Sequence, residues 1–167
     1  MIPAGLLPEG VDWFIAGGYA ACPALATDVD IWVMSPDDAI AEHERLALHL
    51  RSVCPDESLL IDPAPNTDAG FHQQEEYLNS QTLKVAQLWK DGREFHILVT
   101  RQTLEEVLEG FDISTHQVAL TSTGRVVTGK SWTPPHVRPV ELISMPRTAA
   151  RMAKICSRFG HTYKEMV

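Results

Sequence analysis

Cysteines and long apolar runs are scarce in this sequence, and each scarcity excludes a class of protein. The 167 residues include only three cysteines, widely separated and without a Cys-x-x-Cys pair, namely Cys22, Cys54 and Cys156. That pattern supports neither a disulfide framework nor a structural zinc site. No apolar run is long enough to span a bilayer, and the first residues lack the basic region of a secretory leader. We therefore expect a soluble, cytoplasmic protein with no membrane partner.

Basic residues are also scarce over most of the sequence. Residues 1–124 contain 6 Lys or Arg and 20 Asp or Glu, a net charge of −14, whereas residues 125–167 contain 8 and 2, a net charge of +6. Affinity for duplex DNA comes from many phosphate contacts, so a protein with an overall charge of −8 is not expected to bind it. A local basic surface can still bind a triphosphate or a short strand of RNA.

The length and the hydrophobic content favour one compact domain. With 167 residues and 44% hydrophobic content, the chain can bury one substantial core but has little room for two. We expect a single domain over residues 1–167, with an acidic core over about 1–124 and a basic C-terminal segment over about 125–167.

The most informative motif joins a glycine pair to two aspartates. Trp13 to Ala16 is an apolar run typical of a buried strand, and Gly17-Gly18 ends it with backbone that a phosphate can approach closely. A short helix is expected over Tyr19 to Leu25. Asp28 and Asp30 then lie two residues apart in a β-rich segment, so both side chains share one face of a strand. Two such carboxylates are suited to binding Mg2+ together with substrate phosphate oxygens.

This order of strand, Gly-Gly, short helix and Asp-x-Asp strand resembles the nucleotidyltransferase superfamily with the polymerase-beta-type fold. The resemblance implies an α/β (α+β) fold, with a small mixed sheet flanked by helices. It also implies that Gly17 and Gly18 hold the phosphates of a nucleoside triphosphate such as ATP, and that Asp28 and Asp30 bind metal. Each half of the motif has a simpler interpretation, because Gly-Gly alone is usually a turn and Asp-x-Asp alone is usually a solvated strand end.

A second resemblance involves the C-terminal half. The run Leu104 to Ser114, with Gln117-Val118-Ala119 and a late basic segment, is similar to a nucleotidyltransferase-like group found in viral, phage and repeat-containing proteins. In that group a Phe-Asp strand follows the core and a basic helix closes the chain.

The basic segment is predicted to form that helix. Ser144-Met145-Pro146 provides a helix start and Gly160 provides an end. Between them, four cations spaced by four, three and four residues lie on one stripe of a helix: Arg147, Arg151, Lys154 and Arg158. We expect Arg151 and Lys154 to contact nucleotide or acceptor phosphates, within a basic surface completed by Arg147 and Arg158. An ordinary solvated helix face is the alternative.

The third metal ligand is the open question. Active members of the superfamily present a third carboxylate on a later strand, and the corresponding segment here, Glu94 to Val99, has His96 at that position. Imidazole can bind a metal but is a poor match for Mg2+, so His96 is either a ligand or a core histidine satisfied by a hydrogen bond. Asp112 is a candidate for the missing catalytic acid, or it bonds only to local backbone. Glu94 shares the strand face of His96 and is a weaker candidate.

Local patterns predict the remaining elements. An amphipathic helix is expected over Ala39 to Val53, and a short strand over Ser58 to Asp62. Residues 63–79 are expected to form a long loop. The remaining predictions are two strands over Leu83 to Trp89 and Glu94 to Thr100 joined by a hairpin turn, a helix over Thr103 to Gly110, and a strand over Thr115 to Thr121 followed by a turn at Ser122-Thr123-Gly124.

Together these features predict a nucleotidyltransferase that uses Mg2+ to move a nucleoside monophosphate from a nucleoside triphosphate to an unknown hydroxyl. That acceptor is an RNA end, a protein side chain or a small molecule. Two alternatives remain. One is a catalytically inactive protein of this fold that binds nucleotide, RNA or a protein partner. The other is a purely structural role, such as a component of a phage particle.

Overall fold

The structure is a computed structural model that describes residues 2–21, 26, 28–63, 81–111, 116–130, 132, 136–137 and 162–163. The chain divides into two compact units. The first comprises Met1–Phe14 and Asp28–Thr103, and the second comprises Ile15–Thr27 and Leu104–Val167. The prediction of one domain over residues 1–167 stays a prediction.

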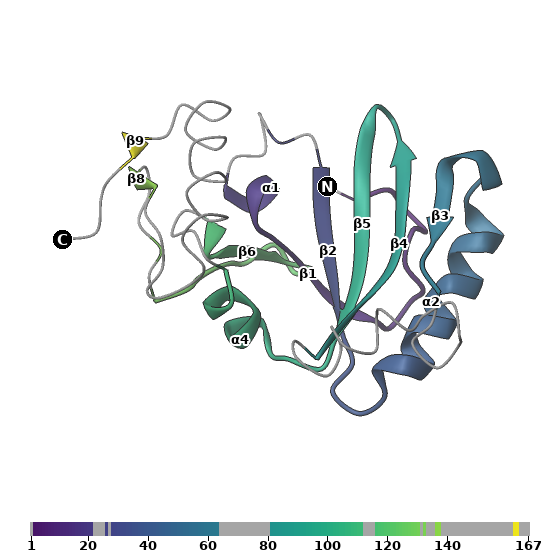
Figure 1. Ribbon diagram of the computed structural model, residues 1–167, viewed down its shortest axis with the longest axis horizontal. Coiled ribbons are helices and arrows are strands. Elements are labelled where there is room, and N and C mark those ends of the chain that lie inside the picture. The colour runs from purple at the N-terminus through teal and green to yellow at the C-terminus, as the bar shows by residue number, and fades with distance from the viewer. Residues whose placement is uncertain are drawn as a thin grey trace. The chain divides into compact units, whose positions relative to one another are not determined.

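The first unit is built on a mixed sheet (Figure 1). Its strands hydrogen bond in the order β3 (Leu59–Ile61), β4 (Thr82–Lys90), β5 (Arg93–Thr100) and β2 (Asp28–Met34). β4 is antiparallel to both β3 and β5, whereas β2 is parallel to β5. β1 (Asp12–Ala16) begins in this unit and ends in the second. The mixture of helices with a mixed sheet confirms the predicted α+β class.

One face of this sheet forms the core of the first unit. Every second residue of β2 is fully buried, and the same alternation continues in β5, at Val29, Ile31, Val33, Ile97 and Val99. Helix α2 (Ala39–Val53) packs against β4 and β5 with its apolar stripe, which includes Leu46 and Leu50. Because side chains alternate along a strand, the residues between these buried positions point to the opposite face.

Helix α2 has the bounds that the sequence predicts. The Asp38 side chain accepts a hydrogen bond of 3.0 Å from the backbone N–H of Ala41, which satisfies a donor at the start of the helix. His43 is 2% exposed, and its Nε2 donates to the backbone oxygen of Lys84 at 3.1 Å. That bond ties the helix to β4. A 3-10 turn, η1 (Asp56–Ser58), then leads into β3.

The hairpin between β4 and β5 is confirmed. Its turn residues Asp91 and Gly92 have φ angles of 54° and 75°. Positive φ at both central residues defines the tight turn whose twist matches that of the flanking strands. The two-residue turn sets the pairing of the strands, starting with Lys90 opposite Arg93.

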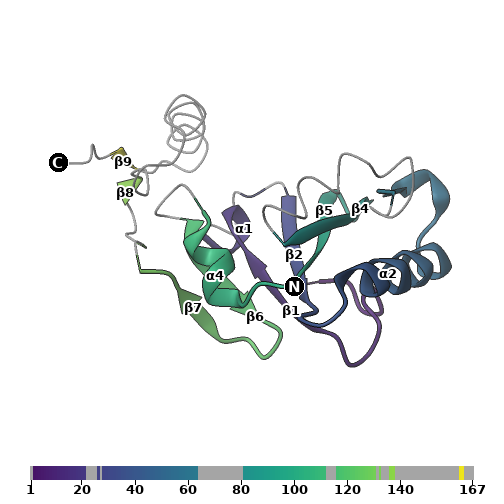
Figure 2. The same cartoon turned by 60° about the horizontal axis from the view of Figure 1, so that its bottom comes forward.

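The second unit contains short elements, among which Figure 2 shows α4 (Leu104–Glu109) beside β6 (Val118–Thr121). β6 pairs with β7 (Val126–Thr128) around the predicted turn. α1 (Gly18–Ala21) contacts β6, and β8 (His136–Val137) pairs in parallel with β9 (Thr162–Tyr163), a pair that the sequence patterns did not predict. The predicted α4 helix is confirmed within one residue at each end. The predicted strand from Thr115 begins only at Val118, because His116 lies in a 3-10 turn.

Several predictions lie outside the described residues. These are Asp112, the four cations of the predicted C-terminal helix, most of the loop predicted over 63–79, and the end of the helix predicted over Tyr19 to Leu25. In the part of the chain that the structure describes, no helix is both long and apolar enough to cross a membrane.

Candidate metal centre

Two neighbouring strands bring the predicted metal ligands together. β2 carries Asp28 and Asp30 on the face opposite the core, and the parallel strand β5 carries Glu94 and His96 on the same face. In the register of the two strands, Asp28 lies opposite Glu94 and Asp30 lies opposite His96. Four polar side chains therefore occupy adjacent positions on a half-buried sheet surface.

Three of these side chains form a cluster that is suited to a metal ion. Asp28, Asp30 and His96 each offer one ligand atom, and the three atoms lie within 4.8 Å of one another. All three residues are of intermediate burial, so the cluster is held in the fold while remaining open to solvent or substrate. Two carboxylate oxygens and one imidazole nitrogen at this spacing fit a divalent cation, with coordination positions left for water and substrate.

The electrostatics of Asp30 agree with that fit. Burial, together with the neighbouring Asp28 carboxylate, raises the pKa of Asp30 from 3.8 to about 6, while His96 acts in the opposite direction. Both leading causes disfavour the negatively charged form of the Asp30 carboxyl. A bound cation would relieve this repulsion.

His96 is held beside an acid and an amide. Its Nε2 atom lies 3.3 Å from Oε1 of Glu94, and the Gln87 amide on β4 donates a hydrogen bond to that same Oε1. Nε2 of His96 is buried and makes no hydrogen bond within the described residues. The two interpretations of His96, a metal ligand and a core histidine satisfied by a hydrogen bond, both stay predictions.

An aromatic pair lies next along β2. Trp32 shares the face of Asp28 and Asp30 by strand alternation, and its ring stacks on that of the fully buried Phe14, with the centroids 6.1 Å apart and the planes within 1° of parallel. This stacking fixes the orientation of the Trp32 ring, which lies two residues along β2 from Asp30.

Of the other predicted site residues, the structure describes Gly17 and Gly18, and neither is among the three clustered ligands. Gly17 and Gly18 belong to the second unit, where Gly17 ends β1 with a φ of 90° and its carbonyl accepts a hydrogen bond of 3.0 Å from the Ala21 N–H. The positive φ explains why glycine stands at this turn. Outside the described residues lie Asp112 and the predicted basic surface, Arg147, Arg151, Lys154 and Arg158.

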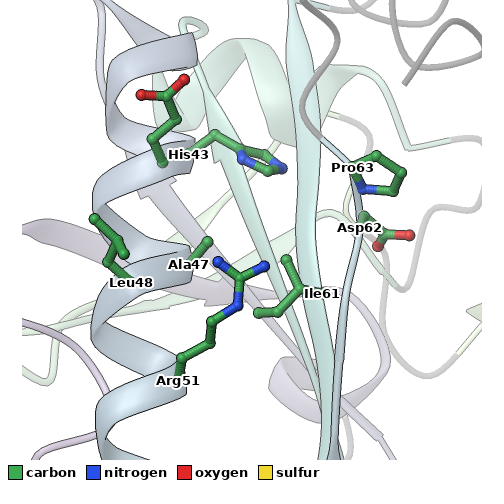
Figure 3. A pocket seen from close by; sticks show the side chains of 8 residues that line it. His43, Ala47, Leu48, Arg51, Ile61, Asp62 and Pro63 are labelled. Atoms are coloured by element: carbon green, nitrogen blue, oxygen red, sulfur yellow. The ribbon is translucent and has the colours of Figure 1, made fainter. Parts of the chain in front are cut away.

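A separate cavity of about 540 Å³ lies between α2 and β3 (Figure 3). Its lining includes His43, Arg51, Ile61 and Asp62, and Arg51 extends from the helix into the space beside Ile61. None of the three clustered ligand residues lines it. The metal cluster and this cavity are therefore distinct features of the first unit.

Comparison with known proteins gives a consistent fold. No protein-family model and no curated protein matches the sequence. Among solved structures, the Thermotoga maritima CCA-adding enzyme complexed with tRNA matches with a TM-score of 0.60 at 18% identity, over 93% of this chain and 36% of that one. A tRNA nucleotidyltransferase complexed with a primer tRNA and an incoming ATP analog matches with a TM-score of 0.58 at 16% identity, over 93% and 44%. The chain has a nucleotidyltransferase-type fold.

A third match, to a tRNA-processing enzyme complex, has a TM-score of 0.58 at 18% identity and covers 93% of this chain. The chain spans less than half the length of each of these structures. The nucleotidyltransferase-type fold predicted from Gly-Gly and Asp-x-Asp is confirmed, whereas the phage-like and viral subgroup stays a prediction.

Gln87 was missed by the sequence patterns. The hairpin turn could have predicted its position. If Asp91-Gly92 is taken as a two-residue turn, the antiparallel register places Trp89 opposite Glu94 and Gln87 opposite His96. Gln87 thus lies on the sheet face that carries the cluster, within hydrogen-bonding reach of Glu94.

Proposed function

We propose that this chain is a metal-dependent nucleotidyltransferase that moves a nucleoside monophosphate from a nucleoside triphosphate to a hydroxyl of an acceptor, with RNA as the acceptor class. The observation that carries the proposal is the cluster of Asp28, Asp30 and His96 ligand atoms within 4.8 Å, on paired strands of a nucleotidyltransferase-type fold. The two similar structures complexed with tRNA support RNA as the acceptor.

The cluster supplies the ligands for a divalent ion, and Mg2+ is the ion predicted from the two carboxylates. When bound, such an ion stabilises the negative charge that develops on the transferred phosphate. Asp28 and Asp30 on one strand and His96 on the other would hold the ion. Asp30 is also the carboxylate proposed to accept the proton of the attacking hydroxyl.

The other roles rest on the resemblance. Gly17 and Gly18 are proposed to donate backbone N–H groups to the triphosphate, and Arg151 and Lys154 to contact phosphates of nucleotide or acceptor. Arg147 and Arg158 are proposed to extend that basic surface, and Asp112 to act as an additional catalytic acid. A cytoplasmic location likewise stays a prediction.

The test is label transfer from each α-labelled nucleoside triphosphate to a pool of small RNAs, with Mg2+ and Mn2+ in separate reactions. The protein is compared with a variant that carries Asp28→Asn and Asp30→Asn, which keeps size and polarity but removes both charges. Asp37→Asn is the matched control, because Asp37 is exposed and outside the cluster. We expect transfer by the protein and the control, with a loss of at least about 1,000-fold in the double variant.

A second candidate function is a nucleotide- or RNA-binding protein of the same fold without catalysis. The observation that favours it is His96, which stands where active members of the superfamily present a carboxylate. This candidate predicts binding of nucleotide that the double variant retains, with no turnover of any nucleoside triphosphate. That combination would overturn the catalytic proposal.

A further inference from the structure

The cluster has a supporting layer on β4 and β5. Glu94 lies two residues before His96 on the same face of β5, with its Oε1 atom 3.3 Å from Nε2 of His96. Gln87, opposite His96 on β4, donates a hydrogen bond to that carboxylate oxygen. Glu94 Oε1 therefore contacts both Gln87 on β4 and His96 of the cluster.

We propose that Gln87 and Glu94 position His96 as a nitrogen ligand, and that the site therefore selects a divalent first-row transition ion over Mg2+. The inference rests on the proposed metal site and deepens it by naming the class of ion. Metal-binding histidines in proteins commonly direct their second ring nitrogen at a carboxylate, which fixes the tautomer and the ring orientation. The Gln87–Glu94 pair supplies such a carboxylate and holds it in place.

The position of Glu94 bears on which ring nitrogen carries the proton. Its carboxylate oxygen, 3.3 Å from Nε2, is placed to accept a hydrogen bond from Nε2 in the tautomer that carries the proton there. That tautomer leaves the lone pair on Nδ1 for the ion. Glu94 therefore acts as a positioning residue, through His96 rather than on substrate.

The donor set then determines the preference among ions. Mg2+ favours all-oxygen coordination and keeps its waters, whereas Mn2+, Co2+ and Zn2+ accept imidazole nitrogen together with carboxylate oxygens. A site with two carboxylates and one imidazole has lost one oxygen ligand and gained a nitrogen relative to three carboxylates. The change weakens Mg2+ and strengthens the transition ions.

The experiment measures binding of metal to the purified full chain without nucleotide. Mn2+ affinity is measured by electron paramagnetic resonance, and Mg2+ affinity is measured by its competition with Mn2+. Coupling of the bound Mn2+ to nitrogen is measured by pulsed electron paramagnetic resonance. We expect nitrogen coupling in the unaltered protein and its loss in His96→Asp. We also expect His96→Asp to lower the ratio of Mn2+ to Mg2+ affinity by at least about tenfold, since it restores the third oxygen ligand.

The positioning role is tested by two further variants. Glu94→Gln is expected to weaken Mn2+ binding by about 10- to 100-fold while the nitrogen coupling remains, because the ligands are kept and only their support is altered. Glu42→Gln is the matched control, since Glu42 is on α2 and is ion-paired with Arg45 away from the cluster. It is expected to change neither affinity nor coupling.

The outcomes separate this inference from the proposed function. Mn2+ bound without nitrogen coupling, or an affinity ratio unchanged in His96→Asp, overturns the inference and leaves nucleotidyl transfer standing. Nitrogen-coupled Mn2+ without transfer to any acceptor supports the inference and counts against the proposed function. Absence of metal binding overturns both.

Discussion

The two faces of the sheet formed by β2 and β5 differ sharply, although both are made by the same two strands. On one face Val29, Ile31 and Ile97 are fully buried against the core that α2 covers. On the other, Asp28, Asp30 and His96 bring their ligand atoms within 4.8 Å of one another. The alternation of a strand lets one face stabilise the fold while the other collects charge that burial disfavours. Substitutions at adjacent positions should therefore separate stability from metal binding.

The largest effect on stability is expected from Ile97→Ala on the core face. Ile97 is 0% exposed, so truncation leaves a cavity and should lower the free energy of unfolding by about 3 kcal/mol. The neighbouring His96→Ala, on the other face, should cost less than about 1 kcal/mol in metal-free protein. Urea unfolding of both variants makes the measurement. Equal losses in the free energy of unfolding of the two variants would contradict the proposal that one face stabilises the fold and the other binds metal.

A comparable effect, on binding rather than folding, is expected from Asp28→Asn. Loss of one carboxylate ligand should weaken Mn2+ binding by about 100-fold or more. The free energy of unfolding of the metal-free protein should not fall, because the substitution also removes the repulsion between Asp28 and Asp30. Titration calorimetry and urea unfolding measure the two quantities. If the variant binds Mn2+ as tightly as the unaltered protein, Asp28 is not a ligand of the metal.

A smaller effect is expected from Asp30→Asn on the stability of metal-free protein. The pKa of Asp30 is raised by burial from 3.8 to about 6, so its contribution to stability is greatest below pH 3.8 and is lost as pH rises through 6. Removing the charge should stabilise the variant above pH 6 by on the order of 1–3 kcal/mol relative to the unaltered protein, with the difference vanishing near pH 4.

Thermal unfolding between pH 4 and 8 with a chelator present checks this, with Asp37→Asn as the exposed control. A stability difference that does not change with pH would mean that the pKa of Asp30 is not raised in the folded protein. Added Mn2+ should reverse the order above pH 6, because only the unaltered protein retains both carboxylate ligands.

The smallest effect is expected at His43, beneath the core face. Burial lowers its pKa below 6.5, opposed by the bond to the Lys84 carbonyl, so the folded protein holds this imidazole neutral. Stability should therefore fall as pH drops below 6.5. His43→Gln keeps an amide donor for that carbonyl and should flatten this part of the pH profile. His49→Gln, on the same helix, is the control, and an equal flattening there would contradict the assignment.

Local features of the fold could be predicted from the sequence, whereas the long-range pairing could not. The Asp38 cap and the apolar stripe fix α2 from neighbouring residues, and Asp91-Gly92 fixes the β4–β5 hairpin. The parallel pairing that brings Asp30 opposite His96 joins residues 66 positions apart, and no local pattern determines it. The role of His96 was open for that reason, since its partners come from two other strands.

The most direct test of the metal centre is a crystal of the protein soaked with Mn2+ and measured for anomalous scattering. The account predicts an anomalous peak bonded to one carboxylate oxygen each from Asp28 and Asp30 and to one nitrogen of His96. A crystal saturated with Mn2+ that shows no peak between these three residues, or a peak bonded elsewhere alone, would contradict it.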